Sequence, residues 1–245
     1  MIFTGNDAWF IPPTSRYGLS RVSSQDLHLT DFTFCARIKI DWDFLIPETN
    51  TQEAGIMIKN GKHLGLSIAK TGDNYRILKG MCWTEESKPI EGSSKPFVLS
   101  NSEQILIPLN AGLDISEDYI DISLSFNIQD KKFKLTANNF EKTQTYTGDL
   151  WDYTASWLWI GVANPLDSCP DEHKHYFKGD IPFCGVFQKY MDMEDIKRIF
   201  DGNWEKTDKP ISIYNFKNTT PYKSLDITKN GNNLIKYDKR WMDEN

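Results

Sequence analysis

The stretch that decides the fold covers residues 157–200. It begins with the apolar run WLWIGVA at 157–163 and continues into a polar loop at 164–175. A second apolar run follows at 181–189. The closing segment DMEDIKRIF at 192–200 starts with an acid that can cap a helix and gathers its apolar residues on one stripe. The stretch therefore predicts a strand, a loop, a second strand and a short helix that must dock on the rest of the protein.

Short apolar runs with a period of two recur along the rest of the chain. In the run 32–40, Phe32 and every second residue share one face and Thr33 begins the other, which predicts a half-buried antiparallel strand. Asn-Gly at 60–61 and Asp-Lys at 130–131 each separate two such runs, as in β-hairpins. Further extended segments are expected at 8–13, 75–83 and 104–109, with loops at 85–96 and 138–156. This pattern favours an all-β, two-sheet antiparallel sandwich of jelly-roll type with one short helix on the C-terminal side.

The bulk composition limits the classes of protein that need be considered. The chain has 245 residues, enough for one large β core, and 39% of them are hydrophobic. No apolar run reaches the roughly 18 residues of a membrane span, so membrane insertion is not expected. The first residues, MIFTGND, lack the pattern of a secretory signal, so we expect synthesis inside the cell. A net charge of -6 disfavours nucleic acid as a partner.

The four cysteines are dispersed at Cys35, Cys82, Cys169 and Cys184. Such spacing does not indicate a disulfide scaffold, and without an export signal we expect the thiols to be mostly reduced. A bridge between Cys169 and Cys184, across the polar loop, is the one pairing left open.

The stretch 157–200 resembles the C-terminal signature of concanavalin A-like jelly rolls, in particular laminin G-like and pentraxin-like domains. Trp-Ile-Gly at 159–161, Tyr-Phe-Lys-Gly at 176–179 and the helix start at 191–196 match its parts. FTFCARI at 32–38 is similar to an early strand of the family, so the resemblance covers most of residues 8–204.

The sequence departs from this family pattern at two places. Pro182 and Phe183 stand where the family usually carries an acidic pair, and an expected N-terminal strand and turn are missing. A similar segment occurs near the C-terminus instead. We therefore divide the chain into a jelly-roll domain at 1–206 and a tail at 207–245, which completes the sandwich in cis or pairs with a neighbouring subunit.

Aromatic residues are the main candidates for ligand binding, because lectin-like sandwiches stack an exposed ring on a sugar. Trp83, Trp151 and Tyr153 are expected in or beside loops, while Asn164 and Asp167 could accept sugar hydroxyls. Packing beneath a loop, or an interface with a protein surface, are the alternatives for each ring.

The polar loop also gathers groups that could bind a metal, namely Asp171, His173 and His175. Their spacing matches no established zinc signature. Calcium held by Asp167, Asp171 and Glu172, as the resemblance suggests, is the alternative, and a solvated loop without metal is the simplest interpretation. No other cofactor is expected.

The motifs do not indicate an enzyme. The Glu-x-Asp-x-Glu pattern of family 16 glycoside hydrolases is missing, as are a nucleophile elbow and a phosphate-binding loop. The resemblance implies a non-catalytic recognition or attachment module, with a carbohydrate as the ligand. The alternative is a structural assembly protein, such as a capsid decoration protein of a bacteriophage or other virion, which would form homo-oligomers or join a capsid. A polysaccharide hydrolase or lyase comes third.

Overall fold

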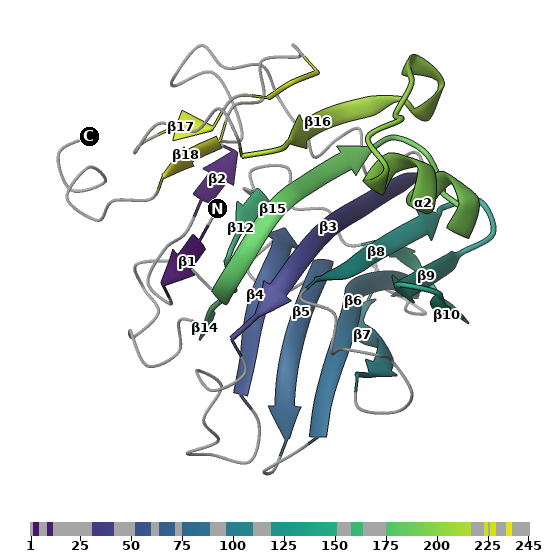
Figure 1. The fold of residues 1–245 in the computed structure, drawn as a ribbon. Coiled ribbons are helices and arrows are strands. Elements are labelled where there is room, and N and C mark those ends of the chain that lie inside the picture. Colours follow the sequence, from purple (N-terminus) through teal and green to yellow (C-terminus); the bar gives the residue numbers. More distant parts are fainter. Residues whose placement is uncertain are drawn as a thin grey trace, which may run out of the picture.

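The protein forms a β-sandwich of two antiparallel sheets with one short α-helix in the part of the chain that is described (Figure 1). This confirms the predicted fold class. The computed structural model describes residues 2–4, 9–11, 31–41, 52–59, 64–71, 75–88, 97–109, 119–150, 158–163, 175–216, 223–224, 226–228 and 234–236.

Sheet A has the strand order β1-β15-β3-β8-β9-β10, and β16 also pairs with β15. Because β3 occupies one edge of β15, β1 and β16 share its other edge in succession. The strands are β1 (Ile2–Thr4), β3 (Phe32–Ile40), β8 (Ile120–Asn127), β9 (Lys132–Ala137), β10 (Phe140–Thr145), β15 (Lys178–Phe187) and β16 (Pro210–Tyr214).

Sheet B has the order β11-β6-β5-β4-β12-β2-β18-β17, with β7 on the other edge of β6. A separate ladder joins β13 (Val162–Ala163) to β14 (His175–Tyr176). The strands of sheet B are β2 (Trp9–Ile11), β4 (Gln52–Lys59), β5 (Leu64–Thr71), β6 (Tyr75–Lys88), β7 (Phe97–Pro108), β11 (Asp149–Leu150), β12 (Leu158–Ile160), β17 (Lys223–Ser224) and β18 (Leu234–Lys236).

Both predicted hairpins are present, as β4–β5 and β8–β9. Two predicted loops were partly wrong. Strand β6 runs on to Lys88 and pairs with β7 from Phe97, so most of the pairing beyond Trp83 falls where a loop was expected. Strands β10 and β11 likewise occupy part of the loop expected at 138–156. These segments are polar edge regions, and hydrogen bonding to a neighbouring strand, rather than apolar alternation, makes them strands.

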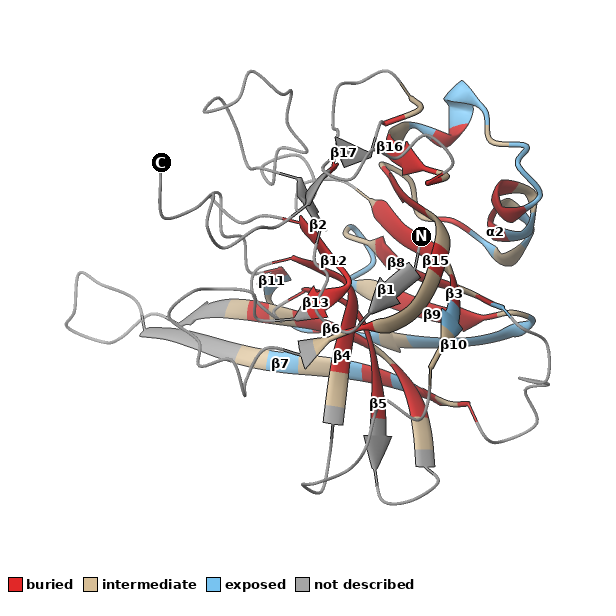
Figure 2. Cartoon of the chain, turned by 60° about the vertical axis from the view of Figure 1, so that its left-hand side comes forward, coloured by how far each residue is buried: buried red, intermediate tan, exposed pale blue. Residues whose placement is uncertain are grey.

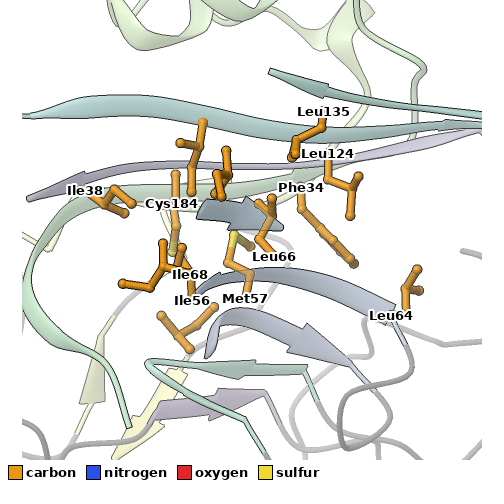
Figure 3. Close-up of a cluster of buried hydrophobic side chains, with 14 of the residues drawn as sticks. Phe34, Ile38, Ile56, Met57, Leu64, Leu66, Ile68, Leu124, Leu135 and Cys184 are labelled. Atoms are coloured by element: carbon orange, nitrogen blue, oxygen red, sulfur yellow. The ribbon is translucent and has the colours of Figure 1, made fainter. Parts of the chain in front are cut away.

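The core lies between the two sheets, where Phe34 and Leu124 of sheet A face Leu66 of sheet B (Figure 3). Gly80 on β6 brings the sheets close together. A Cβ atom at Gly80 would lie 2.7 Å from Leu124 Cδ1 and 2.9 Å from Ile105 Cγ2. Even a methyl group would therefore force these side chains apart.

The first half of strand β3 is covered on both faces, whereas Lys39 near its end is exposed as expected for a half-buried strand. Phe32 and Phe34 pack into the core as expected, but Thr33 and Cys35 on the opposite face are also fully buried (Figure 2). Part of the cover is helix α2 (Met193–Phe200), whose apolar stripe packs with Cys35. The helix confirms the prediction for the segment 192–200.

A hydrogen-bonded cap and an apolar stripe fix the position of α2. Asp192 accepts a hydrogen bond from the Asp195 backbone N–H at 2.8 Å, which satisfies one of the free donors of the first turn. Ile196, Ile199 and Phe200 form the buried side of the helix. The stripe rests on sheet A residues from β3, β15 and β16, which include Cys35, Phe187 and Ile213.

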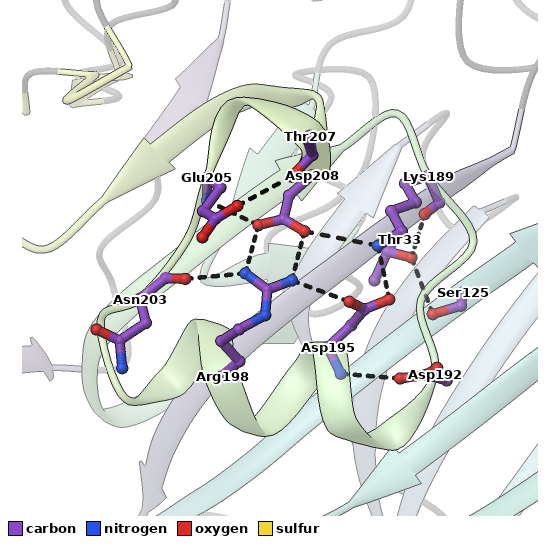
Figure 4. Close-up of polar contacts among 10 residues, drawn as sticks. All are labelled: Thr33, Ser125, Lys189, Asp192, Asp195, Arg198, Asn203, Glu205, Thr207 and Asp208. Carbon is purple, nitrogen blue, oxygen red and sulfur yellow. Dashed lines mark hydrogen bonds and ion pairs between the residues drawn. The ribbon is translucent and has the colours of Figure 1, made fainter.

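An ion pair locks the end of α2 to the 3-10 turn η2 (Lys206–Asp208) that precedes β16 (Figure 4). Arg198 donates from Nη1 to Asp208 Oδ2 at 2.7 Å and from Nη2 to Asp208 Oδ1 at 2.6 Å. The Glu205 backbone N–H also donates to Asp208, at 2.7 Å. These hydrogen bonds, first of all those from Arg198, lower the pKa of the buried Asp208 carboxyl from its ordinary value of 3.8 to about 2.

The described parts of the tail pair with strands of their own chain. Strand β16 bonds to β15, and β18 bonds to β2. The outer edge of β16 is closed by residues 226–228: Ile213 N–H donates to the Asp226 carboxylate at 3.1 Å, and Ile227 N–H donates to Ile213 O at 2.9 Å. Tyr214 on β16 is fully buried in the core. The boundary proposed at residue 206 stays a prediction.

Cys184 is a free thiol buried in the core, so the bridge to Cys169 that the sequence left open is not formed. Cys169 itself lies outside the described residues.

No helix in the described ranges is long and apolar enough to cross a membrane.

The Asp208→Asn substitution should destabilise the fold. It removes the carboxylate that holds Arg198, and we expect a loss of about 2–3 kcal/mol in the free energy of unfolding, measured with urea. This is less than for a fully buried pair, because the Arg198 side chain is 33% exposed. Asp201→Asn, at an exposed acid just beyond the same helix, is the control and should change little. An equal effect of both substitutions would contradict the proposed lock.

The same pair should make stability depend on acid pH. Because folding lowers the pKa of Asp208, its contribution is present above pH 3.8 and is lost as the pH falls towards about 2. The difference in unfolding free energy between the natural chain and Asp208→Asn should therefore shrink between about pH 5 and about pH 2. A difference that stays constant over this range would show that the charge on Asp208 is not what stabilises the lock.

Removal of the tail tests whether it completes the sandwich of its own chain. A chain shortened to residues 1–206 loses Asp208, β16 and the buried Tyr214, and should be insoluble or only partly folded when compared with the full chain by light scattering and near-UV circular dichroism. A soluble, monomeric and cooperatively unfolding shortened chain would argue against completion in cis.

Candidate functional site

Trp83 lies on the outer face of sheet B, pointing away from the core. On β6 the even-numbered positions Leu78 and Cys82 belong to the core, and a Cβ on Gly80 would touch sheet A. Since side chains alternate along a strand, Trp83 and Glu85 point outward. Trp83 is half-buried and sits within a regular strand, not in a loop.

Four polar residues share this face around Trp83. The strand register places Ser102 directly opposite Trp83, and Gln104 one outward position further along β7. On the other side of β6, Asp149 of β11 lies directly opposite Glu85. We call Trp83, Glu85, Ser102, Gln104 and Asp149 the Trp83 patch. Ser102 and Gln104 are exposed, and the Asp149 side chain is 92% exposed, while Trp83 and Glu85 are half-buried.

The short strand β11 is held from both sides. Its inward residue Leu150 is buried in the core together with Tyr146. On the outside, Lys131 Nζ donates to Gly148 O at 2.7 Å and to Asp149 Oδ1 at 3.2 Å. Lys131 belongs to the β8–β9 turn of sheet A, so this contact ties the two sheets together at the patch. The Asp149 carboxylate therefore has a defined position beside β6.

The centre of the outer face of sheet B is much less accessible than the patch. Glu53 accepts hydrogen bonds from Ser67 at 2.8 Å and from Lys79 at 3.0 Å, and both charged side chains are about 85% buried. Ile58 and Met81 form a small buried apolar cluster on the same face. Glu53 is therefore already hydrogen bonded to Ser67 and Lys79, and Ile58 already packs against Met81. Among the side chains described on this face, those of Ser102, Gln104 and Asp149 are exposed and can contact a ligand.

Of the five predicted ligand-binding residues, the described part of the chain contains only Trp83. Trp151, Tyr153, Asn164 and Asp167 lie outside it. The residue before Trp151 is Leu150, which pairs with Thr84, the neighbour of Trp83. Leu150, the last described residue before Trp151, therefore lies beside the Trp83 patch.

The described residues that flank the polar loop lie at the other end of sheet B. Gly161 N–H donates to Ile56 O at 3.0 Å, and β13 follows towards the Gln52 end of β4. Trp83 lies at the opposite end, beyond the row that contains Lys59. At about 3.3 Å per residue these ends are roughly 20 Å apart. Trp83 and the base of the 164–174 connection therefore do not lie side by side.

The predicted metal ligands cannot be placed together. Asp171 and His173 lie outside the described residues, and His175 begins β14, where it pairs with Ala163. Within the described ranges, no three His, Cys, Asp or Glu side chains gather in a way that could hold a metal ion. The metal site in the polar loop stays a prediction.

The sequence did not lead us to select Glu85, Ser102, Gln104 or Asp149 as ligand-binding residues. They come from three strands, and only the register of β6 with β7 and β11 brings them to Trp83. The spacing of Trp83 and Glu85, two residues apart, was the one local signal that they share a face.

The patch offers the chemistry of sugar recognition. An indole ring presents apolar surface to the C–H groups of a sugar, while carboxylates, amides and hydroxyls bond its OH groups. Glycoside hydrolysis needs more, because one carboxyl group must be held in apolar surroundings to act as an acid. The 92% exposed Asp149 is not in such surroundings. Asp149 therefore does not fit the role of that acid.

Comparison with known proteins supports the fold of this chain and assigns it to no family. No protein-family model matches the sequence, and no curated protein is significantly similar to it. Among solved structures, a protein from Bacteroides ovatus ATCC 8483 to which carbohydrate binding has been attributed is similar at a TM-score of 0.56 and 14% identity. The match covers 97% of this chain and 59% of that one, so this chain spans little more than half of that protein.

Two further structures are similar at lower scores. The Ruminococcus gnavus IT-sialidase CBM40 has a TM-score of 0.49 at 10% identity, with 81% of this chain and 95% of that chain covered. The native heptameric SAP-like pentraxin from Limulus polyphemus has a TM-score of 0.43 at 12% identity, with 79% and 81% covered. The structural similarity to the Bacteroides ovatus protein agrees with the jelly-roll fold that the sequence pattern predicted.

Proposed function

We propose that this protein is a non-catalytic carbohydrate-binding module that holds its ligand at the Trp83 patch. The observation that carries the proposal is the position of Trp83: a half-buried indole on the outer face of a sheet, with an exposed hydroxyl, an exposed amide and two carboxylates at neighbouring positions of the same face. We thus propose that the chain shares carbohydrate binding, as well as the jelly-roll fold, with the concanavalin A-like proteins that it resembles.

The strands that carry the patch suit this function because they are rigid. Strand β6 is bonded to β5 and β11 on one edge and to β7 on the other, and its inward side chains are part of the core. A backbone fixed in this way loses little conformational freedom when a ligand binds, which favours affinity for a flexible, well-hydrated sugar.

The Bacteroides ovatus protein supports the proposal at the level of the fold. The same jelly roll serves a protein to which carbohydrate binding is attributed, although fold by itself does not fix function. One of the features that suggested a capsid decoration protein was a tail that could donate a strand to a neighbour. The described tail strands bond to their own chain, which does not favour that alternative.

Trp83→Ala should weaken glycan binding by about tenfold or more, equivalent to about 1.4 kcal/mol, because it removes the stacking surface. Binding would be found on a glycan array and then measured by isothermal titration calorimetry. Phe140→Ala is the matched control, since Phe140 is an aromatic residue 45% exposed on the edge of sheet A. It should bind as the natural chain does.

Trp83→Phe separates loss of the ring from damage to the fold. It keeps an aromatic face on β6 and should retain part of the affinity, with a melting temperature close to that of the natural chain. Full affinity in Trp83→Ala, or equal losses in Trp83→Ala and Phe140→Ala, would contradict the proposed site.

A further inference from the structure

The charges of the Trp83 patch are unbalanced towards the acidic side. Glu85 and Asp149 occupy directly opposite positions on β6 and β11. Such cross-strand pairs have Cβ atoms about 4.5–5.5 Å apart, and two like charges at this spacing repel each other. On the β7 side the exposed positions are Ser102 and Gln104, which are uncharged. A ligand on Trp83 would therefore lie next to two carboxylates.

The lysines described on or beside this face already donate to protein acceptors, and Lys142 donates to the Leu106 carbonyl on β7 at 3.4 Å. Lys131 donates to Asp149 and to the Gly148 carbonyl, as described above. Lys79 lies further along β6, where it donates to Glu53 at 3.0 Å and is largely buried. These two ammonium groups each already face a carboxylate, so an anionic ligand that approached Lys131 or Lys79 would also meet Asp149 or Glu53.

The same groups are well suited to a ligand that carries only hydroxyl groups. An ionised carboxylate accepts hydrogen bonds and cannot donate them, whereas each sugar hydroxyl can donate one. Glu85 and Asp149 can thus accept from hydroxyls on one side of the ring, and Ser102 and Gln104 can donate or accept on the other. A carboxylate or sulfate on the sugar would instead meet acceptors of the same charge.

We propose that the Trp83 patch selects neutral glycans and rejects those that carry a carboxylate or a sulfate near the stacked ring. This inference rests on the proposed function, because it concerns the ligand of the same site. The discrimination arises from the placement of Glu85 and Asp149 beside the indole. Like-charge repulsion at a solvated surface supports about a tenfold preference at low salt, which weakens as salt screens the charges.

The experiment uses a glycan array that pairs each neutral chain with its sialylated and sulfated counterparts, followed by calorimetry on the best pair. The natural chain should bind the neutral member about tenfold more tightly. Glu85→Gln should narrow that ratio. Ser102→Lys places a cation at an exposed position opposite Trp83 and should narrow or invert it. Ser102→Met, similar in length but uncharged, is the matched control and should leave the ratio unchanged.

The outcomes separate this inference from the proposed function. If the natural chain prefers the anionic member and Trp83→Ala abolishes that binding, the site stands and the neutral selectivity is wrong. If Glu85→Gln and Ser102→Lys leave the ratio where Ser102→Met leaves it, the carboxylates do not set the selectivity. If the natural chain binds no member of the array, both proposals fail.

Discussion

Strand β15 must be hydrogen bonded on both edges and covered on both faces, and this requirement organises the sandwich. Its edges are taken by β3 on one side and by β1 and β16 on the other, so the N-terminal strand and the first strand of the tail both pair with β15. Its inner face carries Cys184 and Val186 into the core, and Phe187 on the outer side packs with α2. The Arg198–Asp208 pair then fixes the turn that leads from α2 into β16. A strand that is enclosed in this way leaves sheet A little free surface near α2, and ligand binding is better served by sheet B.

The sequence predicted the elements in which side-chain pattern and backbone structure agree. The alternation that begins at Phe32, the two hairpins and the acid-capped helix are of this kind, since local periodicity and turn residues specify them. Strand β10 was not predicted, because its six residues are almost all exposed and its stability comes from pairing with β9. The extension of β6 to Lys88 was missed because residues 85–88 are polar and lack apolar alternation, while their pairing with β7 makes them a strand. Strand β1 is three residues long, and only its contact with β15 makes it a strand.

The candidate site shows the same division at the level of single residues. Trp83 could be selected from the sequence because a tryptophan ring beside a loop can stack on a sugar. Its place on an outward face follows from the alternation of side chains along β6. Its neighbours could not be selected, because Ser102 and Asp149 reach it through strand registers that the sequence does not reveal. The two sheets meet near this point, where Lys131 of one sheet bonds to Asp149 of the other. Backbone pairing within sheet B and the contact from sheet A hold the strands of the patch in place. The five side chains of the patch supply the groups that would contact a sugar.

A titration of the tryptophan indole N–H signals by two-dimensional nitrogen-15 NMR, with a glycan identified on the array, tests the central claim most directly. Trp83 lies in the patch, whereas Trp204 is partly buried against α2 on the other sheet and serves as an internal reference. The account predicts that the Trp83 signal shifts with saturation behaviour while the Trp204 signal stays in place. A saturating shift of Trp204 with an unchanged Trp83 signal would contradict it.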